Sequence, residues 1–347
     1  MADESRTHIV TPLEPAPAPP LILLPEHAGA PRRSMQYFSG AAALVLMFFA
    51  SASFTVAYLS SGGEIASADS QTAAATTASA DDPFASVSLI AEGAYVLDLA
   101  TNRILYSKNP DAQFALASLV KVPLVLAISE VLEPTAEITV PPHTTPDGAG
   151  IRIPSGLRFE ARDLANFTLV ASSNEGASIL TEAAEDAILV KYPSATQGGA
   201  ALWRMNDIAK NLGLSNMVFL NTNGLDESGT QAGAYGSSRD VALLFGYAAQ
   251  TAPAWFEHTS RDTIVIRAKT GETIPAVNTD EALPAVPGIV MGKTGYTELA
   301  GGNLAVVFEV GPAHPIVAVV MRSTQDGRFS DMKKLVAATV AAIAAGR

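Results

Sequence analysis

One lysine stands inside an otherwise apolar run. The stretch from Phe114 to Ile128, FALASLVKVPLVLAI, carries only Ser118 and Lys121 as polar side chains. A run of this kind predicts a helix that is buried on every face. A lone lysine in such a helix is costly unless the protein uses it, because burial disfavours a charged group. Pro123 is tolerated only in a first helical turn, which places Ser118 at the helix N-terminus.

Ser118 and Lys121 are spaced for a proton transfer, since side chains at i and i+3 share one face of a helix. Burial lowers the pKa of a lysine from about 10.4 toward neutrality, and a second cation nearby, which Lys293 would supply, lowers it further. Lys121 can then accept the hydroxyl proton of Ser118, and free N–H groups at a helix start suit an oxyanion hole. The motif alone leaves open a lysine that merely reaches solvent from an ordinary core helix.

A second polar group, Ser172-Ser-Asn174, lies between the apolar run Phe167–Ala171 and a helical pattern that begins at Glu175. A serine there can relay a proton between Lys121 and a leaving amine, and the asparagine amide can fix a substrate carbonyl or a lysine. Taken by itself, the tripeptide is better explained as a helix cap.

A third group, Lys293-Thr-Gly295, leads into a strand expected from Asn303. An edge strand here would pair with an extended peptide substrate. Gly295 has no Cβ and would let that substrate approach closely, while Lys293 supplies positive charge for a terminal carboxylate. A nucleotide-binding P-loop is excluded because Pro287 stands where that motif needs glycine.

Lys269-Thr-Gly271 is a second copy of the third tripeptide. It lies in a polar, hairpin-like stretch with Glu272 close by, and is interpreted as solvated surface. The histidines lie outside every motif and predict no metal site; they are His8, His27, His143, His258 and His314.

Composition excludes several classes of protein. The net charge of −12 and a pI near 4.9 argue against a nucleic-acid partner. The chain has no cysteine, which excludes disulfides, thiol catalysis and cysteine-ligated zinc, and suits an extracytoplasmic compartment.

The N-terminal part predicts a membrane anchor. Ser34 to Gly63 holds no charged residue, and its apolar core is long enough to span roughly 30 Å of hydrocarbon. Arg32 and Arg33 precede it, so residues 1–33, a Pro-rich tail, are expected in the cytoplasm. Residues 34–60 are the expected single transmembrane signal anchor.

Residues 61–84 then form a flexible, Ala/Ser/Thr-rich linker, and residues 85–347 form the exported folded domain. A signal peptide cleaved after Ala66-Ser-Ala68 is the alternative, and it would release a secreted protein. It is disfavoured because the apolar part of a signal peptide is about 7 to 15 residues long.

The folded part predicts one α+β unit. Two strand-like runs flank a turn at Thr101-Asn102, a mostly helical block extends from Phe114 to about Gln250, and strands return before a closing helix. This order predicts an antiparallel sheet built from both chain ends, with a helical lobe inserted between them. The expected strands are Leu89–Leu99, Arg103–Ser107, Asp262–Arg267, Asn303–Val310 and Pro315–Arg322, and the expected helices include Ala177–Val190, Ala200–Leu212 and Ser330–Ala345.

The three motifs and their flanks together resemble a known family. The sequence is similar, over essentially all of residues 85–347, to serine D-Ala-D-Ala carboxypeptidases, the low-molecular-mass penicillin-binding proteins. The resemblance implies the β-lactamase/DD-peptidase-like fold and makes Lys293, not Lys269, the lysine of the third motif. The matching stretches are Tyr95–Asp98, Thr101–Tyr106, Ala117–Lys121, Ser172–Ala177, Met205–Asn206, Leu212–Gly213, Phe219–Asp226, Ser237–Asp240, Asn278–Thr279, Lys293–Thr297 and Ala300–Gly301.

The resemblance also implies roles for single residues. Ser118 would be the acylated nucleophile, Lys121 its general base and Ser172 a proton shuttle, with no cofactor. The oxyanion hole would be formed by the backbone N–H groups of Ser118 and Tyr296. The residues that would position or bind the substrate are Asn174, Lys293, Thr294, Gly295, Tyr296, Thr297 and Arg328.

The implied function is a membrane-anchored enzyme that trims peptidoglycan stem peptides and is inhibited covalently by β-lactams. A class A β-lactamase shares the motifs, but no ExxLN pattern follows between Glu175 and Gly292 to supply its deacylating glutamate. Endopeptidase and transpeptidase outcomes stay open. A silent wall-binding protein would be expected to lose a motif residue, and an esterase triad is disfavoured because no GxSxG occurs.

Overall fold

The computed structural model describes residues 82–142 and 152–346. The predicted cytoplasmic tail, transmembrane anchor and most of the linker fall in residues 1–81 and lie outside the described part. Within the described residues, no helix is both long and apolar enough to cross a membrane.

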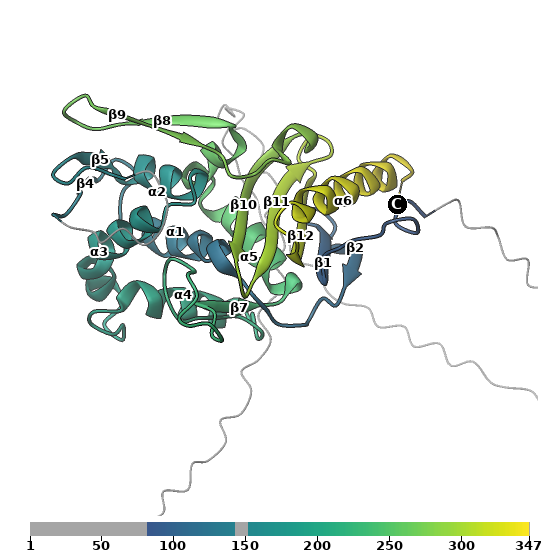
Figure 1. The fold of residues 1–347 in the computed structure, drawn as a ribbon, viewed down its shortest axis with the longest axis horizontal. Coiled ribbons are helices and arrows are strands. Elements are labelled where there is room, and N and C mark those ends of the chain that lie inside the picture. The colour runs from purple at the N-terminus through teal and green to yellow at the C-terminus, as the bar shows by residue number, and fades with distance from the viewer. Residues whose placement is uncertain (1–81, 143–151, 347) are drawn as a thin grey trace, which may run out of the picture. The chain divides into compact units, whose positions relative to one another are not determined.

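A five-stranded antiparallel sheet forms the centre of the domain, with the strand order β10-β11-β12-β1-β2 (Figure 1). Gly93 at the start of β1 lies opposite Met321 near the end of β12. The predicted sheet made from both chain ends is therefore confirmed. Its strands are β1 Gly93–Asp98, β2 Arg103–Lys108, β10 Ile289–Thr297, β11 Gly301–Glu309 and β12 Pro315–Ser323.

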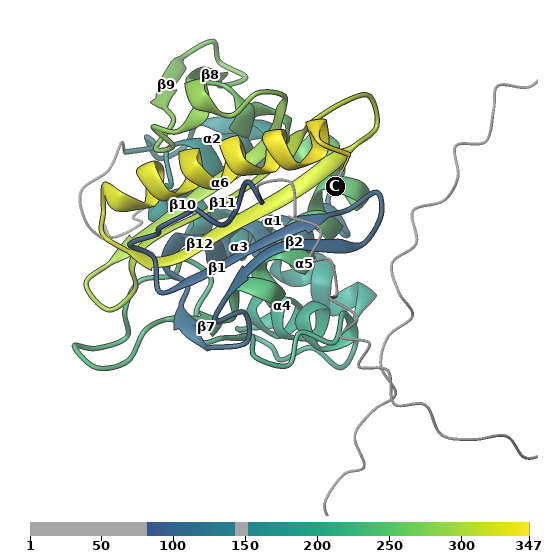
Figure 2. The same ribbon diagram turned by 90° about the vertical axis from the view of Figure 1, so that its right-hand side faces the viewer.

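Helices cover both faces of this sheet. The closing helix α6, Gly327–Ala344, packs across β12 and β11 (Figure 2), and α5, Ser238–Thr251, packs on β1, β11 and β12 from the helical lobe. The central strands are accordingly apolar without alternation, as in Ile316–Met321, all of which is buried. A strand buried on both faces needs apolar side chains on each of them.

The helical lobe surrounds α1, Lys121–Ser129, whose residues are buried from Lys121 to Ile128. Four helices contact it: α2 Ala161–Val170, α3 Asn174–Lys191, α4 Ala200–Asn211 and α5. The prediction of a helix buried on every face is confirmed for this part of the apolar run. The predicted helices Ala177–Val190 and Ala200–Leu212 correspond to α3 and α4.

The first half of the apolar run is not α-helical, and the prediction was wrong there. Phe114–Ala115 forms the short strand β3, and Ala117–Val120 forms a 3-10 turn, η1, that leads directly into α1. Ala117 has a left-handed φ of 48°, which a regular helix does not allow. Ser118 therefore lies in a tight turn, three residues before α1 begins.

The remaining strands form small two- and three-stranded sheets. β3 pairs with β7, Ala234–Gly236, which pairs with β6, Val218–Phe219. The hairpins are β4–β5, Glu137–Thr139 with Arg158–Glu160, and β8–β9, Thr263–Arg267 with Thr273–Val277. Three further 3-10 turns are Pro253–Trp255, Glu257–Ser260 and Leu283–Ala285.

Lys269 lies in the exposed turn of the β8–β9 hairpin, which confirms its interpretation as surface. Its ammonium forms an ion pair at 2.8 Å with a carboxylate oxygen of Glu160, at the end of β5.

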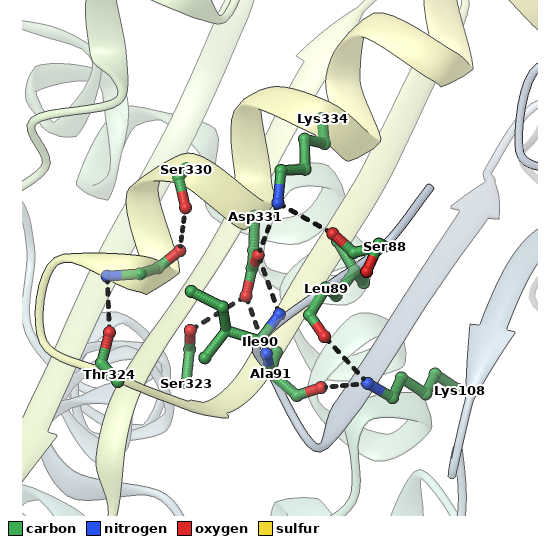
Figure 3. Close-up of polar contacts among 11 residues, drawn as sticks. Ser88, Leu89, Ile90, Ala91, Lys108, Ser323, Thr324, Ser330, Asp331 and Lys334 are labelled. Carbon is green, nitrogen blue, oxygen red and sulfur yellow. Dashed lines mark hydrogen bonds and ion pairs between the residues drawn. The ribbon is translucent and has the colours of Figure 1, made fainter. Parts of the chain in front are cut away.

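A buried carboxylate joins the two ends of the domain (Figure 3). Asp331 of α6 is fully buried and accepts hydrogen bonds from the backbone N–H groups of Ile90 at 3.1 Å and Ala91 at 2.7 Å. The hydroxyl of Ser323, at the end of β12, donates to the same carboxylate at 2.9 Å. Lys108 adds hydrogen bonds to the carbonyls flanking Ile90. The segment before β1 is thus attached to the start of α6.

We expect Asp331→Ala to lower the free energy of unfolding by about 3 kcal/mol, because it leaves two N–H groups and a hydroxyl without their acceptor. Chemical denaturation of the full-length protein measures this change. Ser330→Ala, one residue away on the exposed side of α6, is the matched control and should change it by less than about 1 kcal/mol. Equal effects of the two substitutions would contradict the assigned role of Asp331.

Candidate active site

Lys121 is the centre of a site assembled from three separate segments. Its side chain is fully buried, yet its Nζ lies 2.8 Å from the Oγ of Ser118, 2.8 Å from the Oδ1 of Asn174 and 2.6 Å from the carbonyl oxygen of Asn223. Three oxygen acceptors satisfy the three N–H bonds of an ammonium group. Ser118 itself is partly exposed, so a substrate can reach its hydroxyl.

The same geometry serves a neutral Lys121. Of the three partners, only Ser118 carries a proton that it can donate, whereas the Asn174 and Asn223 oxygens only accept. A neutral amine can therefore donate to these two oxygens and direct its lone pair at the Ser118 hydroxyl. Burial lowers the pKa of Lys121 to about 7, so the neutral form is available near neutral pH. Lys121 is thus placed and tuned to act as a base toward Ser118.

Lys293 is the second buried cation of the site, with 1% of its surface exposed. Burial, followed by the charges of Lys121 and Arg328, holds the pKa of Lys293 well below its usual range. Each of two neighbouring lysines lowers the pKa of the other, so the pair loses its first proton at a lower pH than a single lysine would. The carboxylate of Asp280 favours the charged form of Lys293, but its effect is smaller than those of burial and of the two positive charges.

The strand β10 carries Lys293 along the edge of the sheet, as expected from the sequence. The Nζ of Lys293 donates to the Ser172 hydroxyl at 2.9 Å and to the carbonyl of Thr294 at 2.8 Å. The hydroxyls of Thr294 and Thr279 lie 2.6 Å apart. The second and third motifs are therefore in direct contact through Lys293 and Ser172.

The Ser172-Ser-Asn174 motif combines a helix cap with a site. Ser173 is the N-cap of α3 and accepts the N–H of Gly176 at 3.0 Å, so the capping interpretation is confirmed for the middle residue. Ser172, before it, has a left-handed φ of 55°, and Asn174 begins the helix. A non-glycine residue in this region is strained and occurs often at functional sites. The turn directs the outer two side chains to the two lysines.

Packing within the protein requires glycine at position 295. This reason is additional to the access for a substrate that the sequence suggested. A Cβ on Gly295 would lie 2.7 Å from the carbonyl oxygen of Leu116 and 3.4 Å from the backbone nitrogen of Leu119. These atoms belong to the turn that carries Ser118. The absent side chain therefore lets β10 pack directly against the nucleophile turn.

Three further residues implied by the resemblance have defined positions. Tyr296, next to the last residue of β10, is 41% exposed. The hydroxyl of Thr297 donates to the Oδ1 of Asp226 at 2.9 Å. Arg328 is buried at the start of α6, and its Nη1 donates to the carbonyl of Gly295 at 2.8 Å. Arg328 thus supports β10 from the α6 side, and its contact with a substrate carboxylate stays a prediction.

Some residues of the site carried no assigned role in the sequence. Asn223 acts through its backbone carbonyl, which leaves no residue signature. Thr279 touches Thr294, and burial raises the pKa of Asp280 to about 6. The resemblance included Asn223 and Thr279 among its flanks, and that was the only signal for them. Among the described residues, no group of three or more His, Cys, Asp or Glu side chains could hold a metal ion.

The reaction of Ser118 with a fluorescent penicillin should depend on pH. If the neutral form of Lys121 is the base, as predicted from the sequence, the labelling rate should rise with pH and reach half of its maximum near pH 7. Rates measured between pH 5 and 9 on the full-length protein test this. A rate that is flat across pH 6 to 8 would contradict a base role for Lys121.

Comparison with known proteins gives relatives over most of the chain. The chain is 27% identical over 253 residues to the D-alanyl-D-alanine carboxypeptidase DacF of Bacillus subtilis, covering 71% of this chain and 61% of that protein. It is 28% identical over 256 residues to a D-alanyl-D-alanine endopeptidase of Escherichia coli, covering 72% and 75%. The chain thus spans less than two thirds of the first relative.

The fold matches solved structures of the same kind. Penicillin-binding protein D2 of Listeria monocytogenes in its cefotaxime-bound form superposes with a TM-score of 0.60 at 24% identity, covering 72% of this chain and 97% of that one. The model of the D-alanyl-D-alanine carboxypeptidase family matches residues 74–325. This chain therefore belongs to the D-alanyl-D-alanine carboxypeptidase family of serine peptidases.

Proposed function

We propose that the protein is a serine D-Ala-D-Ala carboxypeptidase that trims peptidoglycan stem peptides through an acyl-enzyme on Ser118. The observation that carries this proposal is the position of the Lys121 Nζ, 2.8 Å from the Ser118 hydroxyl and held by two further oxygens. A buried amine with one proton-donating partner is a base directed at one nucleophile. Membership of the family supplies the substrate class.

Acylation begins when the Ser118 Oγ attacks the carbonyl carbon between the two D-alanines. The hydroxyl proton moves to Lys121, and the carbonyl oxygen becomes an oxyanion that the N–H groups of Ser118 and Tyr296 stabilise. Collapse of this intermediate breaks the peptide bond, and the proton passes to the departing amine of D-alanine. Ser172, bound by Lys293, is the proposed shuttle for that proton.

Deacylation follows the same path in reverse with water in place of the amine. Lys121 removes a proton from water, the hydroxide attacks the ester carbonyl, and the Ser118 oxygen leaves with the proton returned. The terminal carboxylate of the substrate favours the charged form of Lys293, which binds it with Thr294 beside it. The edge position of β10 supports an extended substrate that adds to the sheet as another strand.

β-Lactams are the proposed covalent inhibitors, a reading supported by the cefotaxime-bound state of the Listeria protein. The relative named as an endopeptidase makes cleavage of cross-linked peptides a second candidate outcome at the same site. The two differ only in the leaving amine, which is a free D-alanine in one case and a neighbouring stem peptide in the other.

The test is labelling of the full-length protein with a fluorescent penicillin, read on a denaturing gel and followed by a chase. We expect a band that persists for minutes, and at least about a hundredfold less label in Ser118→Ala, because Ser118 is the one hydroxyl bonded to the Lys121 amine among the residues that the structure describes. Ser129→Ala, at the other end of α1, is the matched control and should label normally.

Product analysis then separates the alternatives. Release of D-alanine from a D-Ala-D-Ala peptide supports the carboxypeptidase, and cleavage of a cross-linked dimer alone supports the endopeptidase. Rapid loss of label with penicillin turnover would indicate a β-lactamase instead. Folded protein that never labels would exclude the acyl-enzyme and favour a wall-binding protein.

We also propose that the enzyme is a single-pass protein of the bacterial cell membrane with its catalytic domain outside the cytoplasm. The uncharged stretch Ser34–Gly63 and the preceding Arg32 and Arg33 support this topology. A linker between anchor and domain would let the site reach the wall.

Membrane fractionation tests this location. The full-length protein should sediment with membranes after a carbonate wash, and a protease added to spheroplasts should degrade the domain. Replacing Leu46 and Phe49 by arginine should release the protein from the membrane, since each charge costs about 3 kcal/mol at a helix centre. The control is Ser51→Ala. Soluble protein starting near Ala68 would instead indicate a cleaved signal peptide.

A further inference from the structure

A single loop contacts both sides of the site. It follows β6 and includes Asn221 to Asp226. Its Asn223 carbonyl accepts from the Lys121 Nζ at 2.6 Å. Three residues later, the Asp226 carboxylate accepts from the Thr297 hydroxyl at 2.9 Å and lies 3.4 Å from the backbone nitrogen of Leu299. Thr297 ends β10, and Leu299 lies in the turn that follows it.

The loop is held in one conformation by its own polar groups. The Asn221 side chain accepts the N–H of Gly224 at 2.7 Å and donates to the carbonyl of Leu225 at 2.9 Å. The Asn223 side chain accepts the N–H of Leu225 at 2.9 Å. Because these bonds connect neighbouring residues, a displacement of Asp226 is transmitted to the Asn223 carbonyl.

The loop also lies directly against the nucleophile turn. Gly224 has a φ of 83°, and a Cβ on it would come within 2.2 Å of the carbonyl oxygen of Ala117 and 3.1 Å of the backbone nitrogen of Ser118. The loop therefore has no free space on this side. Its position is fixed between Ser118, Lys121 and the end of β10.

Both hydrogen-bonding functions of the Thr297 hydroxyl are used within the protein. It donates to Asp226 and accepts the N–H of Ala300 at 3.1 Å. A hydroxyl has one proton to give, so Thr297 cannot donate to a substrate carboxylate while it donates to Asp226. In this arrangement Thr297 links the strand to the loop.

We propose that Asp226 is a positioning residue that fastens the loop Asn221–Asp226 to the end of β10. It thereby sets the spacing between Lys121 and the strand that receives the substrate. This inference rests on the proposed function, because it assumes that Ser118 is acylated with Lys121 as base. Asp226 acts through Thr297 and touches neither substrate nor Lys121.

A double-mutant cycle tests the proposal on the full-length protein, with a fluorescent penicillin as probe. Asp226→Ala and Thr297→Val should each lower the second-order labelling rate by about 10- to 100-fold, the effect of a hydrogen bond to a charged group. The double variant should be no slower than the slower single variant. Asp226→Asn should recover most of the rate, since its amide oxygen still accepts from Thr297.

The pH dependence supplies a readout that general loss of structure would not change. Burial lowers the pKa of Lys121, so a loosened loop that admits water should raise this pKa and move the midpoint of the labelling profile to higher pH. Loss of folded protein would reduce the amount of label without moving that midpoint. Glu298→Gln removes a charge from the exposed position next to Thr297 and should leave rate and midpoint unchanged.

The outcomes are separable. Wild-type protein that does not label would refute the proposed function itself. Wild-type protein that labels, together with an Asp226→Ala rate within twofold of it or rate losses that multiply in the double variant, would overturn the role of Asp226. If Asp226→Ala fails to fold, Asp226→Asn and Thr297→Val, which preserve shape, carry the same comparison of rates and midpoints.

Discussion

The site depends on how a buried amine is satisfied. Lys121 can lie inside the helical lobe only because oxygens from Ser118, Asn174 and Asn223 surround its nitrogen. Each oxygen comes from a different segment, so the nucleophile turn, the start of α3 and the loop after β6 must all be in place together. The same burial that makes these contacts necessary lowers the pKa of the amine and so makes it a base. Structure and reactivity therefore share one cause.

Charge around the site is arranged so that the two lysines differ. Lys293 has Asp280 and Arg328 in its surroundings, whereas Lys121 has neutral partners only. Burial and the positive charges of Lys121 and Arg328 lower the pKa of Lys293, and the Asp280 carboxylate opposes them. In the proposed function, these different surroundings suit the two lysines to different roles, Lys293 to binding an anion and Lys121 to acting as a base.

The sequence predicted those elements whose residues follow a single clear pattern. Continuous apolar runs located β11 and β12, helical periodicity located α3 and α4, and the lone polar pair located Ser118 and Lys121. The sequence did not predict local geometry that depends on contacts between distant segments of the chain. No residue in the run Phe114–Val120 predicts the left-handed backbone conformation of Ala117, which prevents a regular helix there. The Asn223 carbonyl and the pairing of Thr297 with Asp226 likewise need the folded chain, because a backbone oxygen or a paired hydroxyl leaves no pattern.

The hydrogen bond between Ile90 and Asp331 joins residues 241 positions apart in the chain. Contacts of such long range form late, because the entropy of closing so large a loop opposes them until other structure exists. The strand β1 cannot pair with β12 until the C-terminal segment has been synthesised. In an unfinished chain, the pairs β1–β2 and β10–β11 would each present an apolar edge to the place that β12 fills. The central sheet can therefore close only after the C-terminal strand has been made.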